Sequence, residues 1–218
     1  MPLTSETQSK IAEYLLQIKA IKLQAQEPFV WASGWRSPIY CDNRISLSYP
    51  VIRTYIRQQM VKLVQEEFGN PEIIIGVATA GIPQGILVAQ DLGLPFAYVR
   101  SAPKDHGRQN LVEGEVQEGQ RAVVIEDLIS TGKSSLQAIN ALKDKGVDVV
   151  GIVSIFSYGF EEAEEAFKKI HCRYFSLSHY DVLLDEAIKG NYINAQELEM
   201  LRVWRKNPSS WSNQELTS

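Results

Sequence analysis

The sequence predicts an α/β protein with a central, mostly parallel twisted sheet flanked by helices. From residue 73 onward, short all-apolar runs alternate with segments of helical spacing, the pattern of strands buried on both faces and joined by helices. The clearest runs are residues 73–77 and 122–126. A length of 218 residues suits one domain, so we expect residues 1–218 to form a single unit.

The N-terminal part predicts two helices and a hairpin. Residues 6–21 carry apolar side chains at helical spacing, including Ile11 and Leu15. Residues 29–42 contain two β-rich runs around a turn with Ser, Gly and Pro, which predicts a hairpin. Residues 51–68 have helical spacing and end before a Gly-Asn-Pro stop signal.

The remaining elements follow in alternation. Residues 101–120 are polar, contain three glycines and show no periodicity, so they predict either a lid or an ordinary surface loop. The other predicted elements are a turn at 78–83, helices at 84–92, 134–145, 161–169 and near 182–188, a last helix before Trp204, and strands at 96–100, 149–156 and 174–177.

Composition excludes several classes of protein. The formal net charge is −4, so a general nucleic-acid binder, which needs a basic excess, is disfavoured. Cys41 and Cys172 lie far apart with no C-x-x-C pair, which indicates reduced thiols in a cytoplasmic protein. No apolar stretch is long enough for a membrane span, and no signal peptide is visible.

The most informative stretch is residues 123–135. An apolar strand runs into Glu126-Asp127, and a Ser-Thr-Gly-Lys-Ser segment then leads into a helix. Ligands of open α/β sheets bind at the carboxyl ends of strands, and loop amides at a helix N-terminus face an anion. This stretch therefore predicts a phosphate site.

The phosphate site is not a nucleoside-triphosphate loop. That loop needs a glycine five residues before Gly132, where this chain has Asp127. Gly76 and Gly81 have the required spacing, but Ile82 stands in the position of the lysine. The sequence therefore does not support the hypothesis of a kinase or NTPase.

The acid pair has two possible roles. Glu126 and Asp127 could cap the following helix. They could instead accept hydrogen bonds from ribose hydroxyls and stabilise positive charge at C1 in an oxocarbenium-like transition state. The neighbouring hydroxyl- and glycine-containing loop favours the ribose.

Several motifs together resemble one family. The strand, acid pair and Ser/Thr-x-Gly-x-Ser segment resemble the phosphoribosyl-pyrophosphate signature of type I phosphoribosyltransferases. Residues 98–114, with Arg100, Lys104 and His106, resemble the flexible catalytic loop of the orotate phosphoribosyltransferases. Residues 29–44 resemble their N-terminal hairpin and residues 78–83 their pyrophosphate loop. The resemblance covers about residues 15–177 and implies the type I fold.

The resemblance implies a reaction and a set of roles. Orotate and phosphoribosyl pyrophosphate would give orotidine 5′-monophosphate and pyrophosphate, with Mg²⁺ held mainly through substrate rather than by protein ligands. It further implies a cytoplasmic homodimer with shared active sites, and a hood made of residues 1–45 and the C-terminal segment. Lys104 and Asp127 would be catalytic. The residues implied to bind substrates are Arg100, Lys104, His106, Glu126, Asp127, Leu128, Ile129, Ser130, Thr131, Gly132, Lys133 and Ser134.

Some positions depart from the family pattern and leave alternatives open. Ala32, Ala80 and Ser101 stand where many orotate enzymes have lysine. Arg44 could bind the orotate carboxylate in place of a hairpin lysine, or could be a surface or salt-bridge residue. The alternatives to the whole assignment are a purine phosphoribosyltransferase and a non-catalytic regulator that senses phosphoribosyl pyrophosphate.

Overall fold

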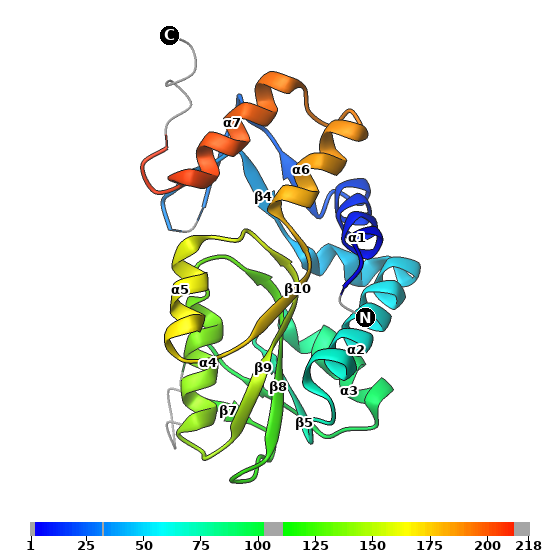
Figure 1. Cartoon of the computed structure of the whole chain (residues 1–218), viewed down its shortest axis with the longest axis vertical. Helices are drawn as coiled ribbons and strands as arrows, with labels where there is room; N and C mark the ends of the chain where they lie inside the picture. Colours follow the sequence, from blue (N-terminus) through cyan, green and yellow to red (C-terminus); the bar gives the residue numbers. More distant parts are fainter. Residues whose placement is uncertain (1–2, 32, 103–110, 212–218) are drawn as a thin grey trace.

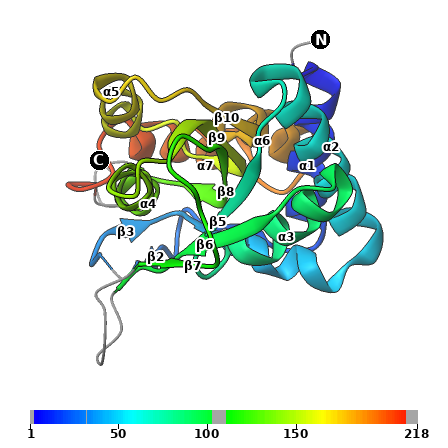
Figure 2. The ribbon, with the colours of Figure 1, turned by 90° about the horizontal axis from the view of Figure 1, so that it is seen from below.

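The computed structural model describes residues 3–31, 33–102 and 111–211. Within these residues, six strands form the central sheet in the order β10-β9-β8-β5-β6-β7 (Figures 1 and 2). All neighbours run parallel except β6 and β7, which are antiparallel. The strands are β5 (Ile73–Val77), β6 (Phe96–Val99), β7 (Val112–Glu113), β8 (Arg121–Ile129), β9 (Asp148–Ser157) and β10 (Tyr174–His179).

The strand order contains a topological switch. From β5 the chain passes through α3 (Gly81–Leu92) to β6 on one side, whereas β8 lies on the other side of β5. From β8 it continues outward through α4 (Lys133–Lys143), β9, α5 (Glu161–Lys169) and β10. Ligands of such sheets bind at the carboxyl ends of the strands that flank the switch, which are β5 and β8 here.

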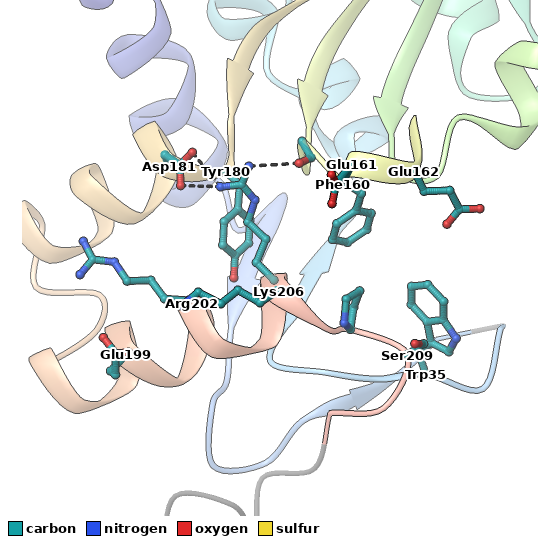
Figure 3. A pocket seen from close by; sticks show the side chains of 13 residues that line it. Trp35, Phe160, Glu161, Glu162, Tyr180, Asp181, Glu199, Arg202, Lys206 and Ser209 are labelled. Carbon is teal, nitrogen blue, oxygen red and sulfur yellow. Dashed lines mark hydrogen bonds and ion pairs between the residues drawn. The ribbon is translucent and has the colours of Figure 1, made fainter. Parts of the chain in front are cut away.

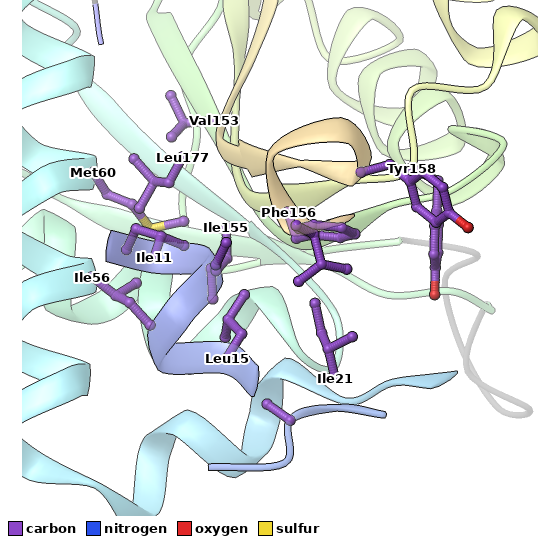
Figure 4. Packing of buried hydrophobic residues seen from close by; sticks show 14 of the residues in the cluster. Ile11, Leu15, Ile21, Ile56, Met60, Val153, Ile155, Phe156, Tyr158 and Leu177 are labelled. Atoms are coloured by element: carbon purple, nitrogen blue, oxygen red, sulfur yellow. The ribbon is translucent and has the colours of Figure 1, made fainter. Parts of the chain in front are cut away.

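Helices cover both faces of the sheet. The helices α1 (Ser5–Gln17), α2 (Pro50–Phe68) and α3 lie on one face, and α4 and α5 lie on the other (Figures 1 and 2). None of the helices in the described residues is both long and apolar enough to cross a membrane. Figure 4 shows α1 and α2 packing on the sheet, with fully buried side chains that include Ile11, Leu15, Ile56, Met60, Val153, Ile155 and Leu177.

A second layer, which we call the hood, combines the two ends of the chain. α6 begins directly after β10, so the hood lies on the carboxyl-end side of the sheet (Figure 1). Two small antiparallel pairs, β1 with β4 and β2 with β3, accompany α6 and α7 there. The hood elements are β1 (Ile21–Leu23), β2 (Phe29–Val30), β3 (Arg36–Ser37), β4 (Ile39–Cys41), the 3₁₀ helix η1 (Asn43–Ser48), α6 (Tyr180–Lys189) and α7 (Ala195–Lys206).

Trp204 of α7 joins the hood to the core. Its side chain is fully buried, and its ring lies 5.6 Å from those of Trp31 and Phe160 and 5.8 Å from that of Tyr158, measured between centroids. Its indole N–H donates to the carbonyl oxygen of Arg36 at 3.2 Å. Aromatic rings from the hairpin, from the segment after β9 and from α7 therefore form one cluster.

The expected helices and hairpin are present in the N-terminal part, but the strand partners and the end of the first helix differ from the prediction. Residues 29–42 do contain a hairpin, β2–β3, yet β4 pairs with β1 instead. We expected residues 6–21 to be one helix, but α1 ends at Gln17 because Lys19 adopts a left-handed conformation with φ 58° and strand β1 follows. Helix α3 begins at Gly81, three residues before the predicted start.

The largest correction concerns the acid-containing stretch. We expected the strand to end at Glu126, but β8 continues to Ile129 because its pairing with β9 persists to the pair Ile129–Ser157. Glu126 and Asp127 thus belong to the strand, and only residues 130–132 form the loop before α4.

The expected loop of residues 101–120 contains the short strand β7, which pairs with β6. A two-residue strand carries no periodicity that a sequence reading could detect. The section of this loop at 103–110 lies outside the described residues.

We predict that Trp204→Ala lowers the free energy of unfolding by about 3–5 kcal/mol, because it removes a fully buried aromatic side chain. We expect hood and core to unfold in one transition, measured by urea titration and circular dichroism. Tyr192→Ala is the matched control, since Tyr192 is 49% exposed and its loss should change stability by less than about 0.5 kcal/mol. A separate hood transition would contradict the prediction.

Candidate active site

The site is centred where the start of α3 touches β8. A Cβ added to Gly81 would lie 2.4 Å from the carbonyl oxygen of Ile125, a distance that no side chain tolerates. The preceding peptide bond between Ala78 and Thr79 is cis. The close approach at Gly81 places the start of α3 directly against the strand that carries the acid pair.

Glu126 is buried, with 4% of its surface exposed. Its Oε1 accepts hydrogen bonds from the hydroxyls of Ser134, at 2.8 Å, and Ser135, at 3.4 Å. Its Oε2 accepts the main-chain N–H of Asp127 at 3.2 Å. The carboxyl group is thus anchored to the first turn of α4.

The acid pair does not cap α4. The N-cap residue is Gly132, in the left-handed region with φ 77°, and no side chain caps the helix there. The capping interpretation is therefore wrong. The first-turn N–H groups and the positive end of the helix dipole remain directed at the loop of residues 130–132, as an anion requires.

Burial changes the ionisation of both acids. It raises the pKa of Glu126 to about 8, with the neighbouring Asp127 charge as the second cause, while Ser134 and Ser135 act in the opposite direction. Burial also raises the pKa of Asp127, against the attraction of Arg44. At neutral pH the ligand-free pair therefore resists carrying two charges.

The phosphate-loop residues take different positions. Ser130 and Thr131 are half-buried, whereas Lys133 and Ser134 are exposed at the start of α4. The Ser134 hydroxyl donates to Glu126 in this structure. Leu128 is half-buried and packs against the apolar core, and Ile129 is fully buried within β8.

Arg100 follows β6, the strand next to β5. Its guanidinium lies 3.5 Å from the carboxylate of Glu113. The main-chain N–H of Arg100 donates to the carbonyl of Leu111 at 2.8 Å. The amide of Gln137 on α4 donates to the carbonyl of Ser101 at 3.1 Å, so α4 contacts the chain just after Arg100. The predicted residues Lys104 and His106 lie outside the described residues.

The segment after β4 contributes a residue that the sequence reading missed. The Asn43 side-chain amide donates to the carbonyl oxygen of Asp127 at 2.7 Å. The sequence signal was a polar residue directly after a strand. Arg44, considered for the orotate carboxylate, instead forms a two-point ion pair with Asp42 at 2.6 and 2.9 Å. The salt-bridge alternative is thus the one seen in the structure.

A separate groove of about 830 Å³ lies between the starts of α5 and α6 and the face of α7 (Figure 3). Arg205 crosses it, paired with Asp181 at 2.7 Å and donating to the carbonyl of Gly159 at 3.1 Å. The groove lies beyond the carboxyl ends of β9 and β10 and not beside β5 and β8. It is lined by Trp35, Gly159, Phe160, Glu161, Glu162, Tyr180, Asp181, Glu199, Arg202, Arg205, Lys206, Pro208 and Ser209.

The chain is similar to known phosphoribosyltransferases in both sequence and structure. Residues 50–190 match the family model described as the phosphoribosyl transferase domain. The orotate phosphoribosyltransferase of Phocaeicola vulgatus is 54% identical over 92% of this chain and 94% of its own. That of Bacillus subtilis is 52% identical over 92% and 93%. The crystal structure of orotate phosphoribosyltransferase from Aeropyrum pernix superimposes with a TM-score of 0.74 at 28% identity, covering 84% of this chain and 99% of that one.

We predict that Glu126 makes stability depend on pH. Its pKa is about 8 in the folded protein against an ordinary 4.5, so its favourable contribution is complete below about 4.5 and is lost as the pH rises through about 8. The free energy of unfolding of wild type relative to Glu126→Gln should therefore fall across this window. Glu165→Gln, at an exposed position of α5, controls for removing a carboxylate. A pH-independent difference for Glu126→Gln would contradict the prediction.

Proposed function

This chain belongs to the orotate phosphoribosyltransferase family, and from that membership we propose how its site works. The reaction transfers the 5-phosphoribosyl group from phosphoribosyl pyrophosphate to orotate, giving orotidine 5′-monophosphate and pyrophosphate, in pyrimidine biosynthesis. The observation that carries the proposal is the acid pair near the carboxyl end of β8, in which Glu126 is buried and Asp127 half-buried, joined to the start of α4 through the Ser134 hydroxyl.

The acid pair serves the ribose. Asp127 is half-buried, and it faces the ribose hydroxyls together with Glu126. Their carboxylates accept hydrogen bonds from these hydroxyls and stabilise the positive charge that develops at C1. A cationic transition state favours the charged form of both acids, which opposes the rise in pKa that burial causes in the free protein.

The backbone and hydroxyls of residues 130–134 hold the 5′-phosphate. The first N–H groups of α4 have no partner within the helix and, with the helix dipole, attract an anion. Hydroxyls of Ser130 and Thr131 add donors, and Ser130 also lies near the orotate. The left-handed Gly132 allows the chain to turn from strand into helix around the phosphate.

The departing pyrophosphate is bound by Arg100, Lys104 and His106. Arg and Lys carry permanent positive charge, and protonated His donates hydrogen bonds. Arg100 follows the carboxyl end of β6, next to β5, where it can act on a ligand at the switch point. The segment with Lys104 would close over the site and exclude water, which would otherwise capture the oxocarbenium-like centre.

We further propose Mg²⁺ as the cofactor. This ion takes oxygen ligands, often from substrate phosphates, and we expect it to be held mainly through substrate rather than by protein ligands. Within the described ranges, no group of three or more His, Cys, Asp or Glu side chains could hold a metal ion. Bound Mg²⁺ would neutralise phosphate charge as the bond to pyrophosphate breaks.

A cytoplasmic homodimer with shared sites completes the proposal. In this arrangement the Lys104 segment of one subunit would serve the Asp127 site of the other. We propose that residues 1–218 form one unit. The hood is narrower than the expected 1–45 at the N-terminus, because α1 packs on the sheet and the hood begins at β1.

The assay that tests the proposed function supplies phosphoribosyl pyrophosphate and Mg²⁺ with either orotate or a purine base. We expect orotate to be consumed with release of pyrophosphate, and we expect chelation of Mg²⁺ to stop turnover. Consumption of a purine but not of orotate would indicate a purine enzyme. Specific binding of DNA or RNA without any turnover would indicate a regulator.

Mixing inactive variants tests the shared sites. We expect Lys104→Ala and Asp127→Asn each to lower turnover at least about 100-fold while the protein stays folded. Co-expressed as a heterodimer, the two should recover about half of the wild-type rate, because one of the two shared sites is then intact. Lys104→Ala mixed with His106→Ala is the control, since both defects lie in the same segment. Absence of rescue would count against shared sites.

A further inference from the structure

Asn43 connects the hood to the acid pair through one buried side chain. It is the first residue of η1, separated from β4 by Asp42, and is 1% exposed. Its Nδ2 donates to the main-chain oxygen of Asp127 at 2.7 Å, across 84 positions in the sequence. Its Oδ1 accepts from the thiol of Cys41 at 3.3 Å. Because both ends of the amide are used, its orientation is set.

The Asp127 carbonyl needs a donor at this point of the sheet. The pairing of β8 with β5 ends at Ile125 and Gly76, so the strand beyond Ile125 has lost a neighbour on that edge. A half-buried carbonyl without a partner is costly. The Asn43 amide supplies the donor that a longer β5 would otherwise have provided.

The main chain of Asp127 is thereby held on both sides. Its N–H donates to the Glu126 carboxyl at 3.2 Å, and its carbonyl accepts from Asn43. The direction of a side chain follows from its backbone and rotamer, so restraining these two groups restrains the carboxylate that faces the ribose.

The turn that carries Asn43 is itself well anchored. The hydroxyl of Ser46 donates to the Asn43 carbonyl at 2.6 Å, and the N–H of Asp42 donates to the carbonyl of Ala20 at 2.8 Å. A displacement of the hood would therefore move the Asn43 amide with it, rather than being absorbed within the turn.

We propose that Asn43 is a positioning residue, which aims the Asp127 carboxylate at the ribose and makes that aim depend on the hood. This inference rests on the proposed function of Asp127. Asn43 acts on the reaction through Asp127 and makes no contact with substrate itself. A misplacement of about 1 Å at a catalytic group can cost on the order of 100-fold in rate, so loss of the amide should be visible in turnover.

A double-mutant cycle tests the proposal with wild type, Asn43→Ala, Asp127→Asn and the double variant. Asn43→Ala should lower kcat by about 10- to 100-fold and leave the KM for orotate within about threefold of wild type. In the Asp127→Asn background the same change should lower kcat by less than about threefold, because the carboxylate to be positioned is gone. Equal fold losses in both backgrounds would overturn the proposal.

A matched variant distinguishes a positioning role of Asn43 from a purely structural one. Asn194→Ala removes the capping box of α7, also in the hood, and should lower Tm by about 2–4 °C with kcat unchanged. If kcat falls in proportion to Tm for both Asn→Ala variants, Asn43 has no positioning role. Asn43→Ser, which is too short to span the gap, carries the test where Asn43→Ala does not fold.

Wild-type turnover of orotate is measured first. Its absence would refute the proposed function, whereas an active wild type with equal losses in the cycle would refute only the role of Asn43.

Discussion

The contact between Gly81 and β8 is the constraint on which the site depends. A glycine hydrogen fits against the Ile125 carbonyl, where a Cβ would lie 2.4 Å away. This approach brings the start of α3 and the loop before it to the residue that immediately precedes Glu126. The carboxyl ends of β5 and β8 thus lie side by side at the switch in strand order.

The electrostatics of the site follow from the same geometry. A strand buried on both faces leaves Glu126 little contact with water, so its carboxyl group relies on the hydroxyls of Ser134 and Ser135. Two adjacent acids at this depth favour a ligand that is positive at one atom and anionic elsewhere. A phosphorylated ribose with charge developing at C1 has this distribution. The N–H groups at the start of α4 supply the positive potential that an anionic group requires.

Two kinds of contact connect the hood to the carboxyl-end side of the sheet. The aromatic cluster around Trp204 joins α7 and the hairpin to Tyr158, which follows β9. The Asn43 amide reaches the main chain of Asp127. The first contact is apolar and stabilises the assembly, whereas the second is directional and orients one strand end.

The sequence by itself determined the α/β class, the central strands and the acid-then-hydroxyl segment from Glu126 to Ser134, because apolar runs and residue types are local properties. Membership of the family supports the roles assigned to that segment. Tertiary structure decided where β8 ends, that β4 pairs with β1, and that Asn43 meets Asp127. These features depend on partners tens of residues away, whose hydrogen bonds no local pattern encodes. The ionisation of Glu126 belongs with them, since burial is a property of the folded chain.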